Sequence, residues 1–318
     1  MIMPANQLVG APSVDISVEW EETACLLCGS PESSPLVEAP DAAPGGSGLW
    51  FAVVQCQKCG LCFTNPRPSL SSSAGFYPQV YRPHRMPESE RRGLSWARPF
   101  KDEFRWGKQA KSMLPRRGRN RLLDLGCGGG NFLERMHRLG WQVTGLDVSE
   151  DAVKRIRYGL ALEARVGTLP CPDLPTAGFD LITMWQTLEH LHEPLEALRD
   201  AHRLLAPGGE LVLSVPNIDS LPFRLFGHAW SGLDLPRHLT HFTPPTLHAM
   251  LERAGFISEP VRMIRHSGWL RASAKLSSRL QQHPVPKQWL RSKAFSRLLT
   301  WYSYCTSQAD CISVRAFK

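Results

Sequence analysis

The sequence predicts an α/β protein in which helices cover both faces of a mostly parallel sheet, with a small cysteine-rich unit ahead of it. Three observations lead to this prediction. From residue 121 onward, short apolar runs alternate with helical stretches. A glycine-rich turn joins the first apolar run to the first helical stretch. Near the N-terminus, two Cys-x-x-Cys pairs have the spacing of metal-binding turns.

The elements are expected at regular intervals along the chain. Strands are expected at 122–125, 143–146, 181–184, 211–215, 256–264 and 311–317, and helices at 131–139, 150–158, 194–205 and 244–254. Pro207, Gly208 and Gly209 separate one helix from the strand that follows it.

Length and composition exclude several classes of protein. A chain of 318 residues with 42% hydrophobic and 21% charged residues is long and apolar enough to fold around a core. No apolar run approaches the roughly 18 residues of a spanning helix, and residues 1–20 lack the basic start of a secretory signal. Nine cysteines, an odd number, favour a reducing compartment with a metal site over a disulfide framework. We therefore expect a cytoplasmic protein.

The net charge of +8 is concentrated in two segments. Residues 82–121 hold 13 Lys/Arg against 4 Asp/Glu, and residues 262–297 hold 9 Lys/Arg and no acidic residue. Such segments often meet phosphate, nucleic acid or a lipid surface. The alternative is a solvated helix face.

The glycine-rich turn carries the strongest functional signal. Asp124 is followed by Gly126, Gly128 and Gly130 in an Asp-x-Gly-x-Gly-x-Gly spacing, directly between a strand and a helix. An acidic residue before the turn suits a ligand that carries a positive charge rather than a pyrophosphate. Asp147 ends the next strand, where a carboxylate can accept hydrogen bonds from both ribose hydroxyls.

Residues 119–260 resemble the class I S-adenosylmethionine-dependent methyltransferases. The motifs that carry the resemblance are the glycine turn, Phe179-Asp180-Leu181-Ile182, Leu188-Glu189-His190 and the run from Leu204 to Gly209. The resemblance implies a seven-stranded Rossmann-like sheet whose last strand is antiparallel. It also implies that S-adenosylmethionine is bound by Asp124, Gly126, Cys127, Gly128, Gly130, Asp147, Val148, Thr168, Leu169, Trp185 and Gln186.

Glu189 and His190 are similar to a pair in the ubiquinone-biosynthesis O-methyltransferase branch. That branch has a further Glu three residues earlier, and the set has been linked to a divalent metal. Here Gln186 takes that position, so we do not expect the metal. His190 remains a candidate catalytic residue, with Glu189 as a brace for the following helix as the alternative.

The segment from Trp230 to Pro244 is expected to lie over the cofactor. His238 and His241 are candidate bases, because an acceptor hydroxyl or carbon must lose a proton near neutral pH. Arg237, Trp230 and Tyr81 are candidate substrate contacts, with Arg237 as an anion anchor. The alternative is that the histidines bond to backbone while Thr243 caps the next helix, and that the aromatic residues near Tyr81 pack in the core.

Cys25, Cys28, Cys56 and Cys59 resemble the two turns of a structural zinc ribbon, with Cys62 as a spare thiol. A ribbon ahead of a methyltransferase is similar to the sugar C-methyltransferases, which share the Cys59–Pro68 pattern. The expected organisation is a flexible tail (1–20), the zinc ribbon (21–65), linker helices or a lid (66–118) and a class I methyltransferase domain (119–318) with a basic helical insertion (267–309).

Two kinds of enzyme and one non-enzyme fit these features. The first is a methyltransferase that acts on an oxygen or carbon of a small or lipid-linked anionic metabolite, such as a phosphate-bearing sugar, with residues 267–309 in peripheral contact with a membrane. The second is an RNA methyltransferase that uses the ribbon and the basic segments to bind RNA. The third is a cofactor-binding protein that has lost catalysis.

Overall fold

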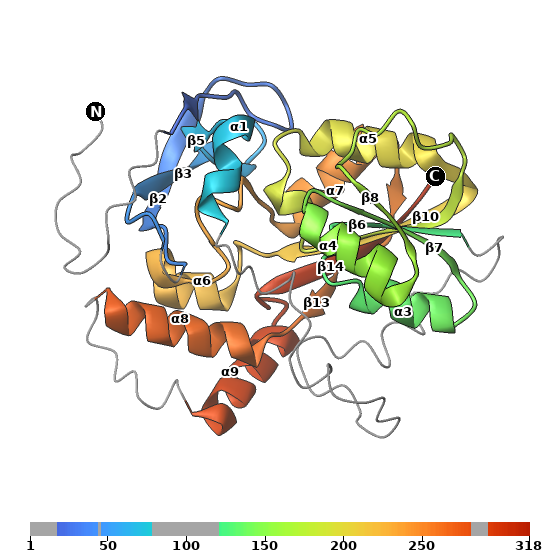
Figure 1. Ribbon diagram of the computed structural model, residues 1–318. Helices are drawn as coiled ribbons and strands as arrows, with labels where there is room; N and C mark the ends of the chain where they lie inside the picture. The colour runs from blue at the N-terminus through green and yellow to red at the C-terminus, as the bar shows by residue number, and fades with distance from the viewer. Residues whose placement is uncertain (1–17, 44–45, 78–120, 281–291) are drawn as a thin grey trace.

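The computed structural model describes residues 18–43, 46–77, 121–280 and 292–318 (Figure 1). A large mixed sheet with helices on both faces occupies one side of the molecule, and a smaller antiparallel sheet and the C-terminal helices occupy the other. Among the described residues, no helix is long and apolar enough to cross a membrane.

Five strands of the large sheet run parallel: β6 (Arg121–Leu125), β7 (Gln142–Asp147), β8 (Glu163–Val166), β9 (Phe179–Trp185) and β10 (Leu205–Pro216). The last strand, β14 (Cys311–Phe317), pairs antiparallel with β10, as the sequence predicts. The strand expected at 256–264 forms as two short strands, β12 (Ile257–Ser258) and β13 (Arg262–Ile264), which pair with opposite ends of β14. The order β12-β14-β10-β9-β6-β7-β8 gives seven positions across the sheet.

Alternating side chains on the central strands explain how the sheet is buried on both faces. Leu123 and Ile182 face one core with helices α5 (Pro194–Leu204) and α7 (Pro244–Arg253). Leu122 and Leu181 face a second core with α3 (Asn131–Arg138) and α4 (Glu150–Arg155). A strand with apolar residues at every position therefore has to lie inside the molecule.

The predicted helices begin where their capping residues stand. The Ser149 hydroxyl accepts a hydrogen bond from the amide of Ala152 at the start of α4. At the start of α7, the side chains of Thr243 and Thr246 each accept a bond from the other's backbone amide, a capping box. The helix expected at 150–158 continues past α4 as one wider turn, Ile156–Leu160.

The N-terminal sheet consists of β2 (Ser33–Pro40), β3 (Trp50–Cys56), β4 (Cys62–Thr64) and β11 (Thr240–His241), in the order β11-β4-β3-β2. Strands β2 and β3 pair antiparallel. Two shorter strands, β1 (Trp20–Glu21) and β5 (Arg67–Pro68), pair beside this sheet. Since β11 comes from the histidine segment, residues 230–244, the small sheet is completed by a part of the chain that is distant in sequence.

The two sheets also share their cores. Val54 and Phe63 of the small sheet pack in the core that holds α5 and α7. On the other side, Phe51 and Val53 pack with helices α6 (Leu221–Phe226) and α8 (Ser267–Arg279). The small sheet is therefore part of one structure with the large sheet.

The remaining helices lie near the small sheet and at the C-terminus. Helix α1 (Leu70–Ser73) and the turns η1 (Ala74–Phe76), η5 (Leu188–His190) and η6 (Gly227–Ala229) are short. Helix α9 (Lys293–Cys305) packs beside α8 below the two sheets in Figure 1. These two helices form within the insertion expected at 267–309.

Candidate active site

The glycine turn connects β6 to α3 at the carboxyl edge of the large sheet. The amides of Gly126 and Cys127 donate hydrogen bonds to the carbonyl oxygen of Leu146, at 2.7 and 3.3 Å. Gly126, Gly128 and Gly130 all have positive φ angles, of 71°, 51° and 80°. The turn can therefore form only where side chains at these positions are absent.

Close packing explains two of the glycines. A Cβ atom at Gly126 would lie 2.8 Å from Cγ2 of Thr187 and closer still to its Oγ1. At Gly145, which the sequence did not single out, a Cβ atom would lie 2.7 Å from Sγ of Cys127. Because Gly145 leaves this space, the Cys127 thiol is buried under the turn, and burial raises the pKa of that thiol.

Two carboxylates stand beside the turn. Asp147 accepts hydrogen bonds from the amides of Gly128 (2.8 Å) and Ser149 (2.9 Å) at the end of β7. Asp124 is buried and accepts a bond of 2.6 Å from the Thr183 hydroxyl. Burial, with the Asp147 charge nearby, raises the pKa of Asp124 to about 7.

The other predicted cofactor contacts lie around the same edge. Val148 is 70% exposed at the end of β7, so its apolar surface is open to a ligand. The buried hydroxyl of Thr168 has no hydrogen-bond partner in the described part of the chain, and Leu169 beside it is buried. The Trp185 ring packs edge-on to Phe132. The Gln186 amide donates to Ser214 and Cys311, so it holds β9 to its neighbours.

The groups at this edge of the sheet fit S-adenosylmethionine. A ribose and a purine need an acceptor carboxylate, an apolar surface and a polar partner, which Asp147, Val148 and Thr168 offer. The buried carboxylate of Asp124 stands at the turn where the cationic part of the cofactor is expected.

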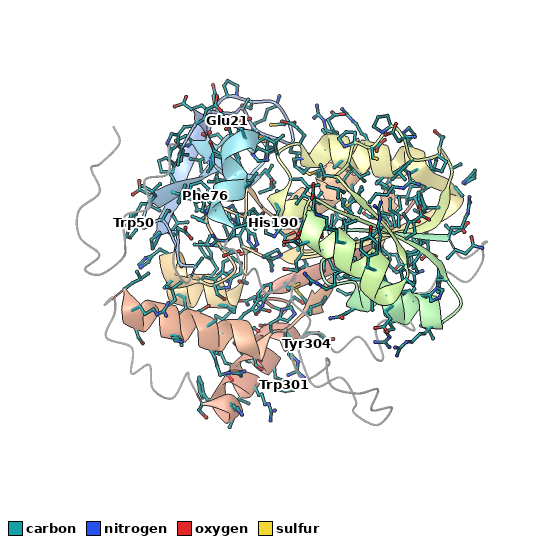
Figure 2. The ribbon with its side chains drawn as sticks, viewed as in Figure 1. Glu21, Trp50, Phe76, His190, Trp301 and Tyr304 are labelled. Atoms are coloured by element: carbon teal, nitrogen blue, oxygen red, sulfur yellow. The ribbon has the colours of Figure 1, made fainter. Side chains whose placement is uncertain are left out.

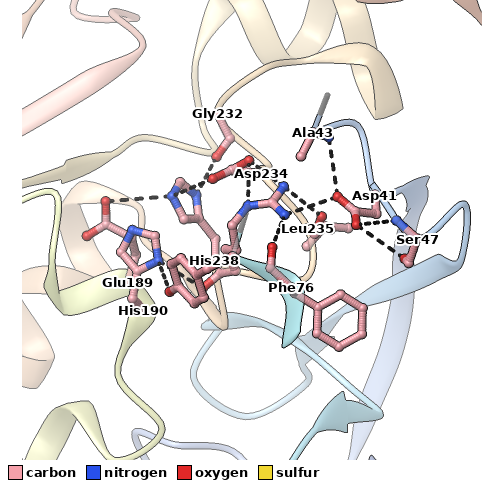
Figure 3. A network of polar contacts seen from close by, with 12 residues as sticks. Asp41, Ala43, Ser47, Phe76, Glu189, His190, Gly232, Asp234, Leu235 and His238 are labelled. Atoms are coloured by element: carbon pink, nitrogen blue, oxygen red, sulfur yellow. Dashed lines mark hydrogen bonds and ion pairs between the residues drawn. The ribbon is translucent and has the colours of Figure 1, made fainter. Parts of the chain in front are cut away.

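A buried polar cluster follows β9 in the chain (Figure 3). It begins at Glu189, two residues after Thr187, which packs against Gly126. Glu189 is fully buried, and neither carboxylate oxygen has a hydrogen-bond partner among the described residues. Oε1 of Glu189 lies 4.0 Å from Nε2 of His238, and the rings of His190 and His238 meet edge-on at 4.6 Å. Burial raises the pKa of Glu189 well above its usual range.

Backbone carbonyls fix the tautomers of both histidines. Nδ1–H of His238 donates to the carbonyl oxygen of Gly232 (2.9 Å), and Nδ1–H of His190 donates to that of Arg237 (3.0 Å). A carbonyl only accepts hydrogen bonds, so each Nδ1 carries the proton and each Nε2 keeps its lone pair. Burial lowers the pKa of His190 to about 3 and that of His238 to about 4. Both rings are therefore neutral at pH 7.

The cluster offers two chemical possibilities. A neutral imidazole and a carboxylate can together accept a proton from a bound hydroxyl. One ligand atom from each of Glu189, His190 and His238 also lies within 4.8 Å of the other two, a separation that a small cation could bridge.

Arg237 lies in an internal ion-pair network rather than in an open anion site. Its guanidinium bonds to Asp234 (2.8 Å), to Asp41 (3.1 Å) and to the carbonyl oxygen of Phe76 (2.9 Å), and the residue is buried (Figure 3). The adjacent carboxylates raise the pKa of Arg237. All these partners belong to the protein, so this arrangement gives Arg237 a structural role and leaves no free anion anchor.

Three further predicted residues are Trp230, His241, whose ring centroid lies 6.5 Å from that of His238, and Tyr81. Trp230 is buried in the core with Phe223, and no described residue bonds its indole nitrogen. His241 lies on β11, where Nε2 is 3.2 Å from the Thr64 hydroxyl and burial lowers its pKa to about 3. Tyr81 lies outside the described residues. His238 thus bonds to backbone and Thr243 caps α7, as in the alternative, whereas His241 bonds to a side-chain hydroxyl.

Tyr77 and Asp234, which stand near the predicted site residues in the sequence, contact the site, and the structure adds Asp41. The Tyr77 hydroxyl lies 3.1 Å from Nδ1 of His190, and burial raises the pKa of the Tyr77 hydroxyl. The signal for Tyr77 was present in the aromatic residues before the basic segment. Asp41 had no local signal, because its partner Arg237 is 196 residues away.

The four cysteines predicted as zinc ligands come together in the small sheet. Sγ of Cys25 lies 3.4 Å from that of Cys59, and Sγ of Cys28 lies 3.6 Å from that of Cys56. All four sulfur atoms lie within 4.8 Å of one another, and Cys62 is not among them. Thiolates about 2.3 Å from a tetrahedral zinc ion stand roughly 3.8 Å apart. The donor set and its spacing fit a structural zinc ion.

Comparison with known proteins agrees with this geometry. Residues 95–258 match a family model described as a methyltransferase domain. The ubiquinone biosynthesis O-methyltransferase of Xanthomonas axonopodis pv. citri is 36% identical over 173 residues, covering 51% of this chain and 72% of that protein. The Xanthomonas oryzae pv. oryzae protein of the same name is 38% identical over the same length. A solved Bacillus halodurans structure, described as that of a methyltransferase, covers 66% of this chain and 97% of its own, with 18% identity and a TM-score of 0.50; it shares the fold.

Proposed function

The chain belongs to the S-adenosylmethionine-dependent methyltransferases, and we propose that it methylates a hydroxyl oxygen of a small or lipid-linked metabolite. The observation that carries this proposal is the distance of 4.0 Å between Oε1 of Glu189 and Nε2 of His238. Glu189 comes two residues after Thr187, which packs against Gly126 of the glycine turn. The names of the two similar Xanthomonas proteins support an oxygen acceptor over a carbon acceptor.

The proposed roles of the residues follow from their surroundings. Gly126, Gly128 and Asp147 hold S-adenosylmethionine, which supplies an electrophilic methyl group. Glu189 and His238 leave a gap of 4.0 Å between Oε1 and Nε2. A hydroxyl oxygen about 2.8 Å from each atom would span that distance. It could hand its proton to the Nε2 lone pair of His238 or to the ionised form of Glu189, whose raised pKa makes it the stronger base.

His190 and Tyr77 act as positioning residues in this proposal. The His190 ring packs edge-on to His238, and Tyr77 and the Arg237 carbonyl fix that ring through Nδ1. A positioned base contributes about 10²- to 10⁴-fold to proton transfer. Removing the His190 ring, which positions His238, is therefore expected to cost only part of that factor.

The anionic character of the acceptor rests on the basic segments, since Arg237 is occupied by Asp41 and Asp234. A phosphate-bearing sugar remains one such acceptor. RNA is the second candidate, because 13 Lys/Arg between residues 82 and 121 suit a phosphate backbone. The N-terminal residues 1–81 hold 2 basic and 7 acidic side chains, which disfavours RNA on the ribbon.

The test uses methyl-labelled S-adenosylmethionine, the purified full chain and an extract of its source organism. We expect label in the organic-soluble or small polar fraction, in a product whose methyl group is on oxygen. Label in RNA would overturn the metabolite proposal. Tight cofactor binding without transfer to any fraction would point to a binding protein.

A further inference from the structure

Helix α9 exposes four large apolar or aromatic side chains on one face and fully buries only small polar ones. Leu298, Trp301, Tyr302 and Tyr304 are 61%, 53%, 53% and 48% exposed. The residues of α9 that are buried are Ser296, Thr300 and Ser303. This is the reverse of the pattern of a helix on the surface of a water-soluble domain.

The buried side of α9 fits closely against α8. The residues that α8 buries include Ser273, Ala274 and Ser277, so both helices have small side chains on their inner faces. The hydroxyls of Thr300 and Ser303 donate to the backbone carbonyls of Ser296 and Thr300, at 2.8 and 2.9 Å. The polar groups of the inner face are thus satisfied within α9, and Phe295 and Leu299 beside them pack partly buried against the core that holds Leu270 of α8.

The outer face is broad and continuous. At 100° per residue, Ala294, Leu298, Trp301 and Cys305 lie within one narrow arc of the helix, with Tyr302 and Tyr304 on its two sides. Figure 2 shows the Trp301 and Tyr304 side chains on α9. Aromatic rings with a polar edge are the side chains that favour the boundary between lipid and water.

The charge around this face has one sign. Residues 262–297 contain 9 Lys/Arg and no Asp/Glu. The exposed ones in α8 and α9 are Lys275, Arg279, Lys293 and Arg297. Two copies of this surface would repel each other, whereas an anionic lipid surface would attract it.

We propose that α8 and α9 bind the protein to the surface of a bilayer that contains anionic phospholipids. The α9 face of Leu298, Trp301, Tyr302 and Tyr304 enters the headgroup region, and the basic residues contact lipid phosphates. The proposal stands on a surface separate from the residues assigned to methyl transfer.

The experiment is flotation of the full chain with phosphatidylcholine vesicles and with vesicles containing 30% phosphatidylglycerol, about the anionic content at which surface charge attracts basic segments. We expect binding to the anionic vesicles only, weakened about tenfold or more by 0.5 M salt. The Trp301 emission is expected to shift to shorter wavelength on binding.

The test variant is Leu298→Ser with Trp301→Ser, and the matched control is Trp50→Ser. Trp50 is 49% exposed on β3 of the small sheet, apart from α9 in Figure 2. We expect the double variant to lose about tenfold or more of the vesicle affinity with an unchanged melting temperature, and the control to bind like the native chain. Absence of native binding to anionic vesicles, or equal binding by the double variant, would overturn the proposal. So would a concentration-dependent dimer that the double variant abolishes.

Discussion

The glycine turn and the histidine segment were both singled out from the sequence, yet they relate differently to their surroundings. In the turn, the amide of Gly126 donates to Leu146 and that of Gly128 to Asp147, and both acceptors lie on the adjacent strand β7. In the histidine segment, Arg237 and His241 bond to Asp41 and Thr64, which come from the N-terminal sheet.

The difference shows what a local motif can specify. The turn is made by backbone geometry and one neighbouring strand, so its spacing alone predicts its shape. The imidazole and guanidinium groups of the histidine segment are compatible with catalysis or with hydrogen bonds inside the protein. Which of the two they adopt depends on residues up to 196 positions away.

The largest effect is expected when the small sheet loses its predicted metal site, because this sheet supports the histidine segment. Cys25→Ser removes one of the four predicted zinc ligands, and a structural zinc ion contributes on the order of 10 kcal/mol to folding. We expect one zinc per native chain by elemental analysis, none in Cys25→Ser, and loss of amide protection in β3, β4 and β11. Cys62→Ser, a buried thiol outside the ligand set, is expected to keep its zinc. A full equivalent of metal in Cys25→Ser would instead assign the ion elsewhere, with Glu189, His190 and His238 as the candidates.

The second effect tests whether Arg237 is structural. Arg237→Ala leaves Asp41 and Asp234 without their partner, and breaking a buried ion pair costs about 3–5 kcal/mol. Arg224→Ala removes an exposed pair with Asp219, so its cost is expected to stay below about 1 kcal/mol. Chemical denaturation measures both free energies of unfolding. A stable Arg237→Ala variant with a raised KM for the acceptor would restore the anion-anchor interpretation.

The third effect tests the turn itself. Gly126→Ala places a methyl group against Thr187, and the positive φ adds strain, so we expect cofactor affinity to fall about 100-fold. Gly140→Ala has a similar φ of 89° but open space around its Cβ, and should bind the cofactor normally. Asp147→Ala should abolish cofactor binding. Isothermal titration with S-adenosylhomocysteine compares the three variants, and unchanged affinity in Asp147→Ala would contradict the ribose assignment.

The smallest effect separates the two histidines of the segment. His241→Ala loses a hydrogen bond to Thr64, which costs about 1–2 kcal/mol of stability, and turnover below the melting range should stay within about threefold of native. His238→Ala should lower turnover and spare cofactor binding. Equal losses of turnover in both variants would show that both act in catalysis.

The fold was largely predictable because apolar strands and capped helices are local signals. The strand β8 was missed because Glu163, Arg165 and Val166 are exposed at the sheet edge, so the run is not apolar. In the site, the glycine turn and the cysteine spacing could be read directly. Trp230 could not be assigned, because a tryptophan in a loop gives no sign of the core that surrounds it.

The most direct test of the account compares cofactor affinity and methyl-transfer rate in Glu189→Gln. The amide keeps the volume of the side chain but cannot accept a proton, so we predict affinity within about twofold of native and a rate lowered about 100-fold. Glu196→Gln, on the exposed side of α5, is the control and should match the native protein in both. A transfer rate in Glu189→Gln close to that of native protein would contradict the assignment of Glu189 and His238 as the proton-accepting pair.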